Sequence, residues 1–248
     1  MQSFLYPECE KVVYPSTHFG DKSCPKKPDY SEGYVWKLYP DYYIFLTDLR
    51  DKTIKRLTKS PGYDAEATIA FDGSKIIYIS IESGDLDIWT MGSNGQNKTQ
   101  LTNELGYDAS KTVWRIYHPN SDNEIDQYEK LLKENSIRPM ASQIWIMNSY
   151  GSNKKQIPNN NAANFGPYFF LDGNYIIFSS NLQDEKRRDF DLYSIKVDGS
   201  DLERITFSDG FDVFPMFSPS GKYLVFASNR NQKRRGDINL FLAEWNYQ

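Results

Sequence analysis

Histidine and cysteine, the residues that most often bind metals or act in catalysis, are scarce: the chain of 248 residues contains two of each. Cys9 and Cys24 lack the spacing of metal ligands, so they are either two free thiols or one disulfide. The motifs G-x-S-x-G and H-E-x-x-H and the phosphate-binding P-loop are all missing. The sequence therefore contains no complete catalytic motif, and we expect neither a cofactor nor a bound metal.

Long apolar runs and a large charge of one sign are also missing. No segment approaches the roughly 18 apolar residues of a membrane helix, and residues 1–10, MQSFLYPECE, lack the basic and apolar regions of a signal peptide. The formal net charge is −4, whereas proteins that bind nucleic acids or membrane surfaces concentrate positive charge. We therefore expect no membrane span and no nucleic-acid binding, and the residues alone do not identify a compartment.

What the sequence does contain is an internal repeat. With 39% hydrophobic and 15% aromatic residues, the chain can bury a substantial core. Similar phrases occur at 69–82 (IAFDGSKIIYISIE), 169–182 (FFLDGNYIIFSSNL) and 217–230 (FSPSGKYLVFASNR), with a weaker copy at 5–18 (LYPECEKVVYPSTH). The first three combine an apolar start, a glycine-containing turn and an alternating apolar run. This pattern predicts two strands joined by a tight turn.

A second phrase predicts a third strand with an aromatic residue at its centre. It occurs five times, as YIFLTD (43–48), DIWTMG (87–92), QIWIMN (143–148), DLYSIK (191–196) and NLFLAE (239–244). Because each repeat shares this position, we expect its side chains to pack in the core; they are Phe45, Trp89, Trp145, Tyr193 and Phe241. A polar turn and a short fourth strand follow in four copies, ending in KRLT, TQLT, KQIP and ERIT.

The spacing of these phrases predicts a β-propeller. Thr58 and Thr102 are 44 residues apart, and Pro158 and Thr206 are 48 apart, which is typical of four-stranded propeller blades and not of helical solenoids. We therefore expect one all-β domain over residues 1–248. Its five antiparallel repeats lie at about 1–58, 59–102, 103–158, 159–206 and 207–248.

Three segments, GYDAEATIAFDGSKIIYIS, DIWTMGSNGQNKTQLT and FPMFSPSGKYLVFASNR, resemble the WD40-like propeller repeats of the TolB-like proteins. The resemblance extends over almost the whole chain. It implies derivation from a propeller of six blades, of which this chain supplies five, and it suggests a periplasmic or secreted setting. The resemblance is specific for the fold and not for the function, because the same repeat serves binding proteins, protease accessory domains and some lyases.

Two repeats depart from the pattern. Sixteen residues separate the end of one fourth strand from Lys75, Tyr175 or Tyr223, but only eight precede Lys111, so we expect the third repeat to lack its inner strand. The last repeat is expected to lack its outer strand after 239–244. Such edges leave backbone groups unpaired and invite strand addition. We therefore expect a fragment, or a subunit that associates with a missing N-terminal segment, a second copy or another protein.

Two long insertions are expected on the same face of the propeller, at 18–42 and 118–142. Within the second, the apolar residues recur at helical spacing, which predicts a short amphipathic helix at about 122–135; they are Ile125, Tyr128, Leu131 and Leu132. Insertions on one face of a rigid scaffold commonly carry recognition. The alternative is that they only cap the channel.

The two histidines are expected at equivalent places, each after a second strand. The other repeats fill the position of His18 and His118 with Glu82, Leu182 and Arg230. Paired imidazoles can form structural hydrogen bonds, or they can bind a transition metal or act as acid and base. The sequence favours the structural role, because it offers no third fixed ligand.

A ring of short polar residues is expected where the inner strands begin: Asp64, Asp108, Asn164 and Asp212. A short acceptor there can bond the backbone amides of the preceding turn, which explains why Asp and Asn interchange. The alternative is an acidic channel mouth that attracts a cation or a basic peptide. The candidate binding residues at the channel mouth are these four together with His18, Glu82, His118 and Arg230.

The leading functional interpretation is a noncatalytic scaffold that binds a protein or a peptide on the face carrying the two insertions, as the TolB-like resemblance implies. The alternative is a polysaccharide lyase or a hydrolase-like enzyme with a metal and histidine site at the channel mouth.

Overall fold

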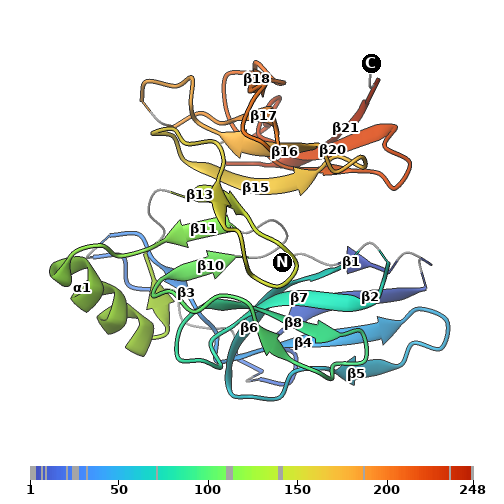
Figure 1. Ribbon diagram of the computed structural model, residues 1–248, viewed down its shortest axis with the longest axis vertical. Coiled ribbons are helices and arrows are strands. Elements are labelled where there is room, and N and C mark those ends of the chain that lie inside the picture. Colours follow the sequence, from blue (N-terminus) through green and yellow to red (C-terminus); the bar gives the residue numbers. More distant parts are fainter. Residues whose placement is uncertain are drawn as a thin grey trace. The chain divides into compact units, whose positions relative to one another are not determined.

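The computed structural model describes most of the chain and is shown in Figure 1. The residues outside the description are 1–3, 7, 9, 21, 24–27, 32, 71, 110–113, 139–141, 187, 235 and 247–248, together with the side chains of 109 and 114–117. Cys9 and Cys24 are among them. The chain forms two compact units, one comprising 1–110 with 115–140 and the other 111–114 with 141–248.

The first compact unit contains two complete repeats and the start of a third. The strands of the first repeat are β1 (Phe4–Leu5), β2 (Lys11–Ser16), β4 (Asp41–Asp48) and β5 (Ile54–Arg56). Those of the second are β6 (Gly62–Ile69), β7 (Lys75–Ser80), β8 (Asp87–Gly92) and β9 (Thr99–Gln100). Neighbouring strands within each repeat pair antiparallel, as the sequence predicts.

The prediction that the third repeat lacks its inner strand is wrong. The repeat has an inner strand, β10 (Tyr107–Ala109), beside β11 (Trp114–Tyr117), although this strand is only three residues long. Residues 106–109, GYDA, repeat the start of β6, and the eight residues that would complete an inner strand are missing before Lys111. The inner strand is therefore shortened and not absent, because the retained residues suffice for its first few backbone pairs.

The strands after residue 141 lie in the second compact unit. They are β13 (Gln143–Ile146) with β14 (Lys155–Gln156); β15 (Asn164–Phe169), β16 (Tyr175–Ser180), β17 (Asp191–Lys196) and β18 (Glu203–Arg204); and β19 (Asp212–Phe217), β20 (Tyr223–Ser228) and β21 (Asn239–Glu244). The last sheet has three strands within the described residues, as predicted. On β21, Leu240 is 78% and Leu242 is 67% exposed. Association through this edge stays a prediction.

The predicted helix is confirmed as α1 (Asp122–Lys133). Acidic residues lie in its first turn and Lys130 and Lys133 in its last, which complements the helix dipole. Its one buried residue is Tyr128, whose hydroxyl donates to Asp85 Oδ1 at 2.5 Å. No helix in the described part of the chain is long and apolar enough to cross a membrane.

The central aromatics of the third strands are core residues, as predicted. Phe45 and Tyr193 are buried, while Trp89, Trp145 and Phe241 are half-buried. Trp89 packs against a cluster that includes Val13, Ile44 and Ile76, and Phe241 packs against another around Phe217 and Phe226.

The tight turns between first and second strands also follow the sequence. Gly73 and Gly173 both have φ of 71°, a left-handed conformation that favours glycine. In each turn an aspartate accepts a backbone hydrogen bond at 2.9 Å, Asp72 from Ser74 and Asp172 from Asn174. The DG dipeptide therefore fixes the register of the two strands that it joins.

A threonine at the end of the fourth strand bonds the third strand in three repeats. The hydroxyls of Thr58, Thr102 and Thr206 accept hydrogen bonds at 2.9–3.0 Å from the amides of Ile44, Ile88 and Leu192. Thr102 also donates to Asp87 Oδ1 at 3.1 Å. The terminal threonine of KRLT, TQLT and ERIT thus has a structural role: its hydroxyl bonds the third strand. This role explains why the phrase recurs.

We expect Thr102→Val to lower the free energy of unfolding by about 1–3 kcal/mol, because it leaves a buried amide without its acceptor at nearly constant side-chain shape. The matched control is Thr99→Val, since Thr99 is exposed on β9. Urea unfolding measures both variants. Equal stabilities of Thr102→Val and the parent protein would show that this bond does not hold the blade.

Candidate functional site

The two insertions meet in the first compact unit. Strand β3 (Trp36–Lys37) of the first pairs antiparallel with β12 (Ser136–Ile137) of the second. The amide of Leu38 donates to Asn135 O at 2.8 Å, and Lys37 Nζ donates to Glu134 O at 2.6 Å. Strand β3 and helix α1 therefore lie in the same part of this unit (Figure 1). The pairing joins two segments about 100 residues apart in sequence into one structured rim.

A pocket of about 340 Å³ lies between the first insertion and the inner strands β6 and β10. Aromatic side chains line most of it: Tyr30, Tyr34, Trp36, Tyr39, Tyr63 and Tyr107. We call it the tyrosine pocket. Its volume is at the lower end of the roughly 300–1,000 Å³ of small-ligand sites, so it has room for one side chain or a small molecule.

The rings of the tyrosine pocket differ in exposure and orientation. Tyr30 and Tyr34 are 50% and 63% exposed and stack with their centroids 5.8 Å apart, whereas Tyr107 is buried. The Trp36 ring lies edge-on to Tyr107 at 6.4 Å, and its Nε1 donates to the Tyr34 hydroxyl at 3.2 Å. Tyr63 stacks against Tyr42 at 5.4 Å. The aromatic lining therefore extends from solvent to the core, and contacts between the rings hold them in place.

One carboxylate, Glu66, lines the tyrosine pocket. The Tyr107 hydroxyl donates to Glu66 Oε1 at 3.1 Å. Burial raises the pKa of Tyr42, Tyr63 and Tyr107, and the negative charge of Glu66 adds to the effect. The phenols are consequently neutral near pH 7, so Glu66 supplies negative charge beside uncharged aromatic rings.

A backbone irregularity places Glu66 at this position. Strand β6 shifts register relative to β7 between Ala65 and Thr68, and Glu66 has φ of 50°. The equivalent bulges in β15 and β19 carry Gly166 and Phe214, at φ of 62° and 55°. Bulges redirect a side chain relative to the regular alternation of a strand. The bulge therefore recurs in three repeats, whereas of these three only the blade of β6 has a carboxylate, Glu66, at this position.

A second cavity, of about 330 Å³, lies against the same rim. It shares Pro28, Val35 and Lys37 with the tyrosine pocket, and its other lining residues are mostly polar, including Lys130, Glu134 and Arg138. The rim therefore separates an aromatic surface from a polar one.

A buried polar network fixes α1 and the third repeat beside these cavities. Asp85 accepts from the Tyr128 hydroxyl and, at 2.7 Å, from the amide of Gly106. Asp87 accepts from Ser83, Gln100 and Thr102. Burial raises the pKa of Asp85 and of Asp87, and the hydrogen bonds that they accept oppose this rise. These partners give the carboxyls structural roles.

The four polar residues that begin the inner strands are buried, but their partners differ from those predicted. The Ser80 and Thr58 side chains oppose the rise that burial causes in the pKa of Asp64. Asp108 bonds His118 Nε2 at 3.0 Å, Asp212 bonds Ser228 Oγ at 2.6 Å, and Asn164 donates to Asn160 and Gln143. Two amides of these turns are bonded instead by Asn181 and Asn229, whose side-chain oxygens accept from Ala163 and Phe211 at 2.8 Å.

The physical reason for this correction is position along the strand. The four ring residues already lie within or beside the sheet, so their side chains face other side chains of the same blade or of the preceding one. An asparagine just after the second strand faces the turn and can reach its amide. Contact between a ligand and the four ring residues stays a prediction.

The residues after the second strands are equivalent in four repeats. The amides of His18, Glu82, Leu182 and Arg230 each donate to a serine hydroxyl two residues earlier, at 3.1–3.2 Å. Their side chains then diverge: His18 packs 4.1 Å from the Phe45 ring, Glu82 pairs with Lys98, and Arg230 pairs with Asp212. His118 instead bonds Asp108. Among the described residues, no group of three or more His, Cys, Asp or Glu side chains is placed to hold a metal ion.

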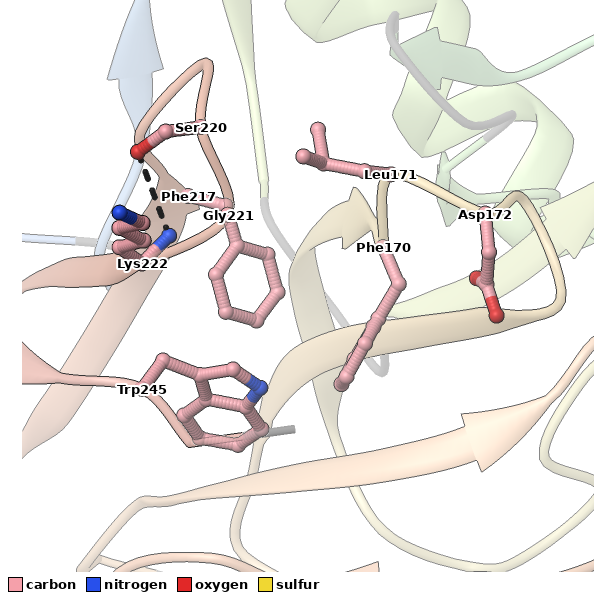
Figure 2. A pocket seen from close by; sticks show the side chains of 8 residues that line it. All are labelled: Phe170, Leu171, Asp172, Phe217, Ser220, Gly221, Lys222 and Trp245. Carbon is pink, nitrogen blue, oxygen red and sulfur yellow. Dashed lines mark hydrogen bonds between the residues drawn. The ribbon is translucent and has the colours of Figure 1, made fainter. Parts of the chain in front are cut away.

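The second compact unit contains an apolar pocket of about 300 Å³ at its short turns. Figure 2 shows the rings of Phe170, Phe217 and Trp245 facing one another across it. The Trp245 ring lies 5.7 Å from Phe170 and 5.2 Å from Phe217, and its amide donates to Lys222 O at 2.7 Å. Trp245 therefore extends the core of this unit, and the pocket offers mainly apolar surface, with Asp172 and Lys222 as its charged lining residues.

Sequence reasoning missed the tyrosine pocket and Glu66. One signal was available: residues 30–43 contain Tyr30, Tyr34, Tyr39, Tyr42 and Tyr43. An alignment of the repeats also shows that Glu66 occurs where the fourth and fifth repeats have Gly166 and Phe214. Neither signal shows that the two features come together, because the pocket requires the fold of the insertion.

Sheets of four antiparallel strands, repeated with the same turns, bulges and threonine bonds, define a β-propeller protein. No family model matches the sequence. Among solved structures, the chain is similar to a putative TolB from Agrobacterium tumefaciens, with 19% identity and a TM-score of 0.64 over 98% of this chain and 76% of that one. It is similar to TolB from Acinetobacter baumannii, with 17% identity and a TM-score of 0.64 over 98% of this chain and 51% of that one.

A third similar structure is an oligogalacturonate lyase from Vibrio parahaemolyticus, with 11% identity and a TM-score of 0.51 over 98% of this chain and 76% of that one. These similarities confirm the predicted all-β fold, a TolB-like β-propeller. The chain spans about three quarters of the length of the first TolB structure and about half of the second.

The buried Asp64 gives a testable pH dependence. Burial raises its pKa above the ordinary value of about 3.9, so the folded state holds this proton more tightly than the unfolded state. The contribution of Asp64 to stability is therefore fully present below about pH 4 and is lost as pH rises through the folded pKa. Asp64→Asn, which copies Asn164, removes this loss. We expect its free energy of unfolding, relative to the parent protein, to increase from about pH 4 to pH 7.

The control is Asp72→Asn. The amide and hydroxyl of Ser74 hold the pKa of the exposed Asp72 below its usual value. The ionised Asp72 therefore stabilises the folded parent protein, and the free energy of unfolding of Asp72→Asn, relative to the parent protein, decreases with rising pH. Chemical unfolding at several pH values measures both. A relative stability of Asp64→Asn that is flat or decreasing with pH would contradict the assignment.

Proposed function

We propose that this chain is a noncatalytic scaffold that binds a peptide segment of another protein, and that the tyrosine pocket is its recognition site. The observation that carries the proposal is the pairing of β3 with β12, which builds a rim from two insertions beside an aromatic pocket. Loops placed on a rigid scaffold are the usual carriers of recognition.

The composition of the site supports binding of a protein segment. Tyrosine and tryptophan are enriched at protein interfaces because each offers a large apolar surface, a polar tip and few rotatable bonds. Tyr30 and Tyr34 are mostly solvent-accessible, yet they stack on each other and Trp36 bonds Tyr34. Such a surface is ordered before binding, so less conformational entropy is lost when a partner arrives.

The hydrogen bonding of the candidate catalytic groups also supports a binding role. His118 is engaged with a buried aspartate, and His18 packs on Phe45 and bonds Ser16 at 3.1 Å. The carboxyls of Asp85 and Asp87 accept hydrogen bonds from the groups that hold α1 and the second blade. Each group has a structural partner within its own unit, so none requires a substrate to explain its position.

Similarity to TolB structures is consistent with this proposal, but the propeller fold serves several functions. The similarity to an oligogalacturonate lyase makes lyase activity the outcome that a functional test must separate from binding. The two functions differ in their product: a lyase releases an unsaturated sugar, whereas a scaffold leaves its partner unchanged.

A display selection of random peptides against the folded chain tests the proposal. We expect enriched peptides whose affinity for Tyr34→Ala is at least about tenfold lower than for the parent protein, because the variant removes one wall of the pocket. The matched control is Tyr150→Ala, since Tyr150 is 83% exposed in the second compact unit. Its affinity for the peptides should equal that of the parent protein.

Failure to enrich any peptide, or enrichment of peptides that bind Tyr34→Ala as well as the parent protein, would overturn the proposal. In parallel, the chain is incubated with oligogalacturonate and the ultraviolet absorbance of unsaturated product is followed. If the amount of unsaturated product rises in proportion to the amount of protein, the chain is a lyase and the proposal of a noncatalytic scaffold is wrong.

A further inference from the structure

The proposed function leaves open what kind of peptide segment enters the tyrosine pocket. We propose that the pocket receives a proline-rich segment in the polyproline II conformation, with its pyrrolidine rings on the exposed tyrosine faces and a backbone carbonyl on a phenol hydroxyl. This inference rests on the proposed function, since it names the class of segment that the scaffold binds.

The exposed part of the tyrosine pocket is an aromatic surface. Tyr30 and Tyr34 are each at least half exposed and stack with their planes 22° apart. Behind them, the Trp36 ring lies edge-on to the buried Tyr107, with an angle of 87° between the planes. Domains that recognise proline-rich peptides use grooves lined by aromatic residues. The pocket therefore offers the kind of surface on which proline rings pack.

The two charged residues of the lining already have partners in the protein. The Tyr107 hydroxyl donates to Glu66 Oε1 at 3.1 Å, and Lys37 Nζ donates to Glu134 O at 2.6 Å. One charge is negative and the other positive, so the two cancel in the sum over the lining. Neither side chain is needed as a partner of the ligand. A neutral occupant fits this lining better than an ion, because an ion would lose its hydration without gaining a counter-charge.

Two phenol hydroxyls at the rim of the pocket can donate hydrogen bonds to a peptide. The Tyr34 hydroxyl accepts from Trp36 Nε1 at 3.2 Å, which uses a lone pair and leaves its O–H as a donor. Within the described part of the chain, Tyr30 contacts the Tyr34 ring, and its hydroxyl has no hydrogen-bond partner. A polyproline II segment forms no internal hydrogen bonds, so its carbonyls are acceptors that match these donors.

The stiffness of both partners favours this occupant. The pairing of β3 with β12 fixes Trp36, and Trp36 and Tyr30 in turn hold the Tyr34 side chain. A polyproline II segment is already extended before it binds, so little conformational entropy is lost on either side. Its three residues per turn place every third residue on the same side. Prolines three residues apart therefore face the pocket together.

Two probes of identical composition test the inference directly: acetyl-hexa-L-proline amide and its all-D counterpart. They form helices of opposite hand, so they differ in shape and not in chemical groups. The readout is the indole N–H signal of Trp36 in nuclear magnetic resonance spectra, assigned with Trp36→Phe. We expect a saturable shift with the L peptide and an affinity at least about fivefold lower for the D peptide.

Variants of Tyr30 supply the second arm. Tyr30→Ala removes an exposed ring, and we expect it to bind the L peptide at least about tenfold more weakly. Tyr30→Phe keeps the ring and removes only the hydroxyl, and we expect binding about twofold to tenfold weaker. The matched control is Tyr150→Ala in the second compact unit, which should bind like the parent protein. Circular dichroism confirms folding, and the comparison of the L and D peptides needs no variant.

Equal binding of the two hexaproline peptides, or no shift of Trp36 with either, would overturn the inference. The outcome separates from that of the proposed function. Display peptides that depend on Tyr34 but lack proline would leave the scaffold standing and would sink only the polyproline specificity. Failure of the display selection itself would remove the scaffold.

Discussion

Each strand of this protein must satisfy its backbone amides and carbonyls, and the structure follows from the ways in which it does so. Within a blade the neighbouring strand supplies most partners. Some backbone amides at or next to the start of a strand bond to a side chain and not to a neighbouring strand. The amide of Ile88 donates to the Thr102 hydroxyl, and the amide of Ala163 donates to the Asn181 side chain. The insertions obey the same rule, because β3 finds its partner in β12.

This pairing connects the backbone requirement to the candidate site. A segment as long as 18–42 would have no fixed shape if its backbone groups were bonded only to water. Pairing at Trp36 and Lys37 fixes the segment that follows Tyr30 and Tyr34, and the bulge of β6 fixes Glu66 in the lining of the same pocket. The pocket is thus formed by backbone constraints, while its chemistry comes from side chains that those constraints leave free to vary.

Local patterns predicted the elements that depend on neighbouring residues. The DG turns, the third-strand aromatics and the helix at 122–133 all follow from periodicity or turn chemistry within about 15 residues. The short strand β10 was missed because three residues give no periodic signal. The pairing of β3 with β12 was missed because it is non-local, and the position of Glu66 because a bulge breaks the alternation from which side-chain direction is read.

The central claim is that recognition occurs at the rim of the first compact unit. Hydrogen exchange measured by mass spectrometry, with and without a selected peptide, tests it most directly, because a bound segment slows the opening of the backbone that it covers. The account predicts slower exchange in 28–39 and 62–66, with unchanged exchange around the apolar pocket at 170–172 and 217–222. Slower exchange at 170–172 and 217–222, with none at the rim, would contradict it.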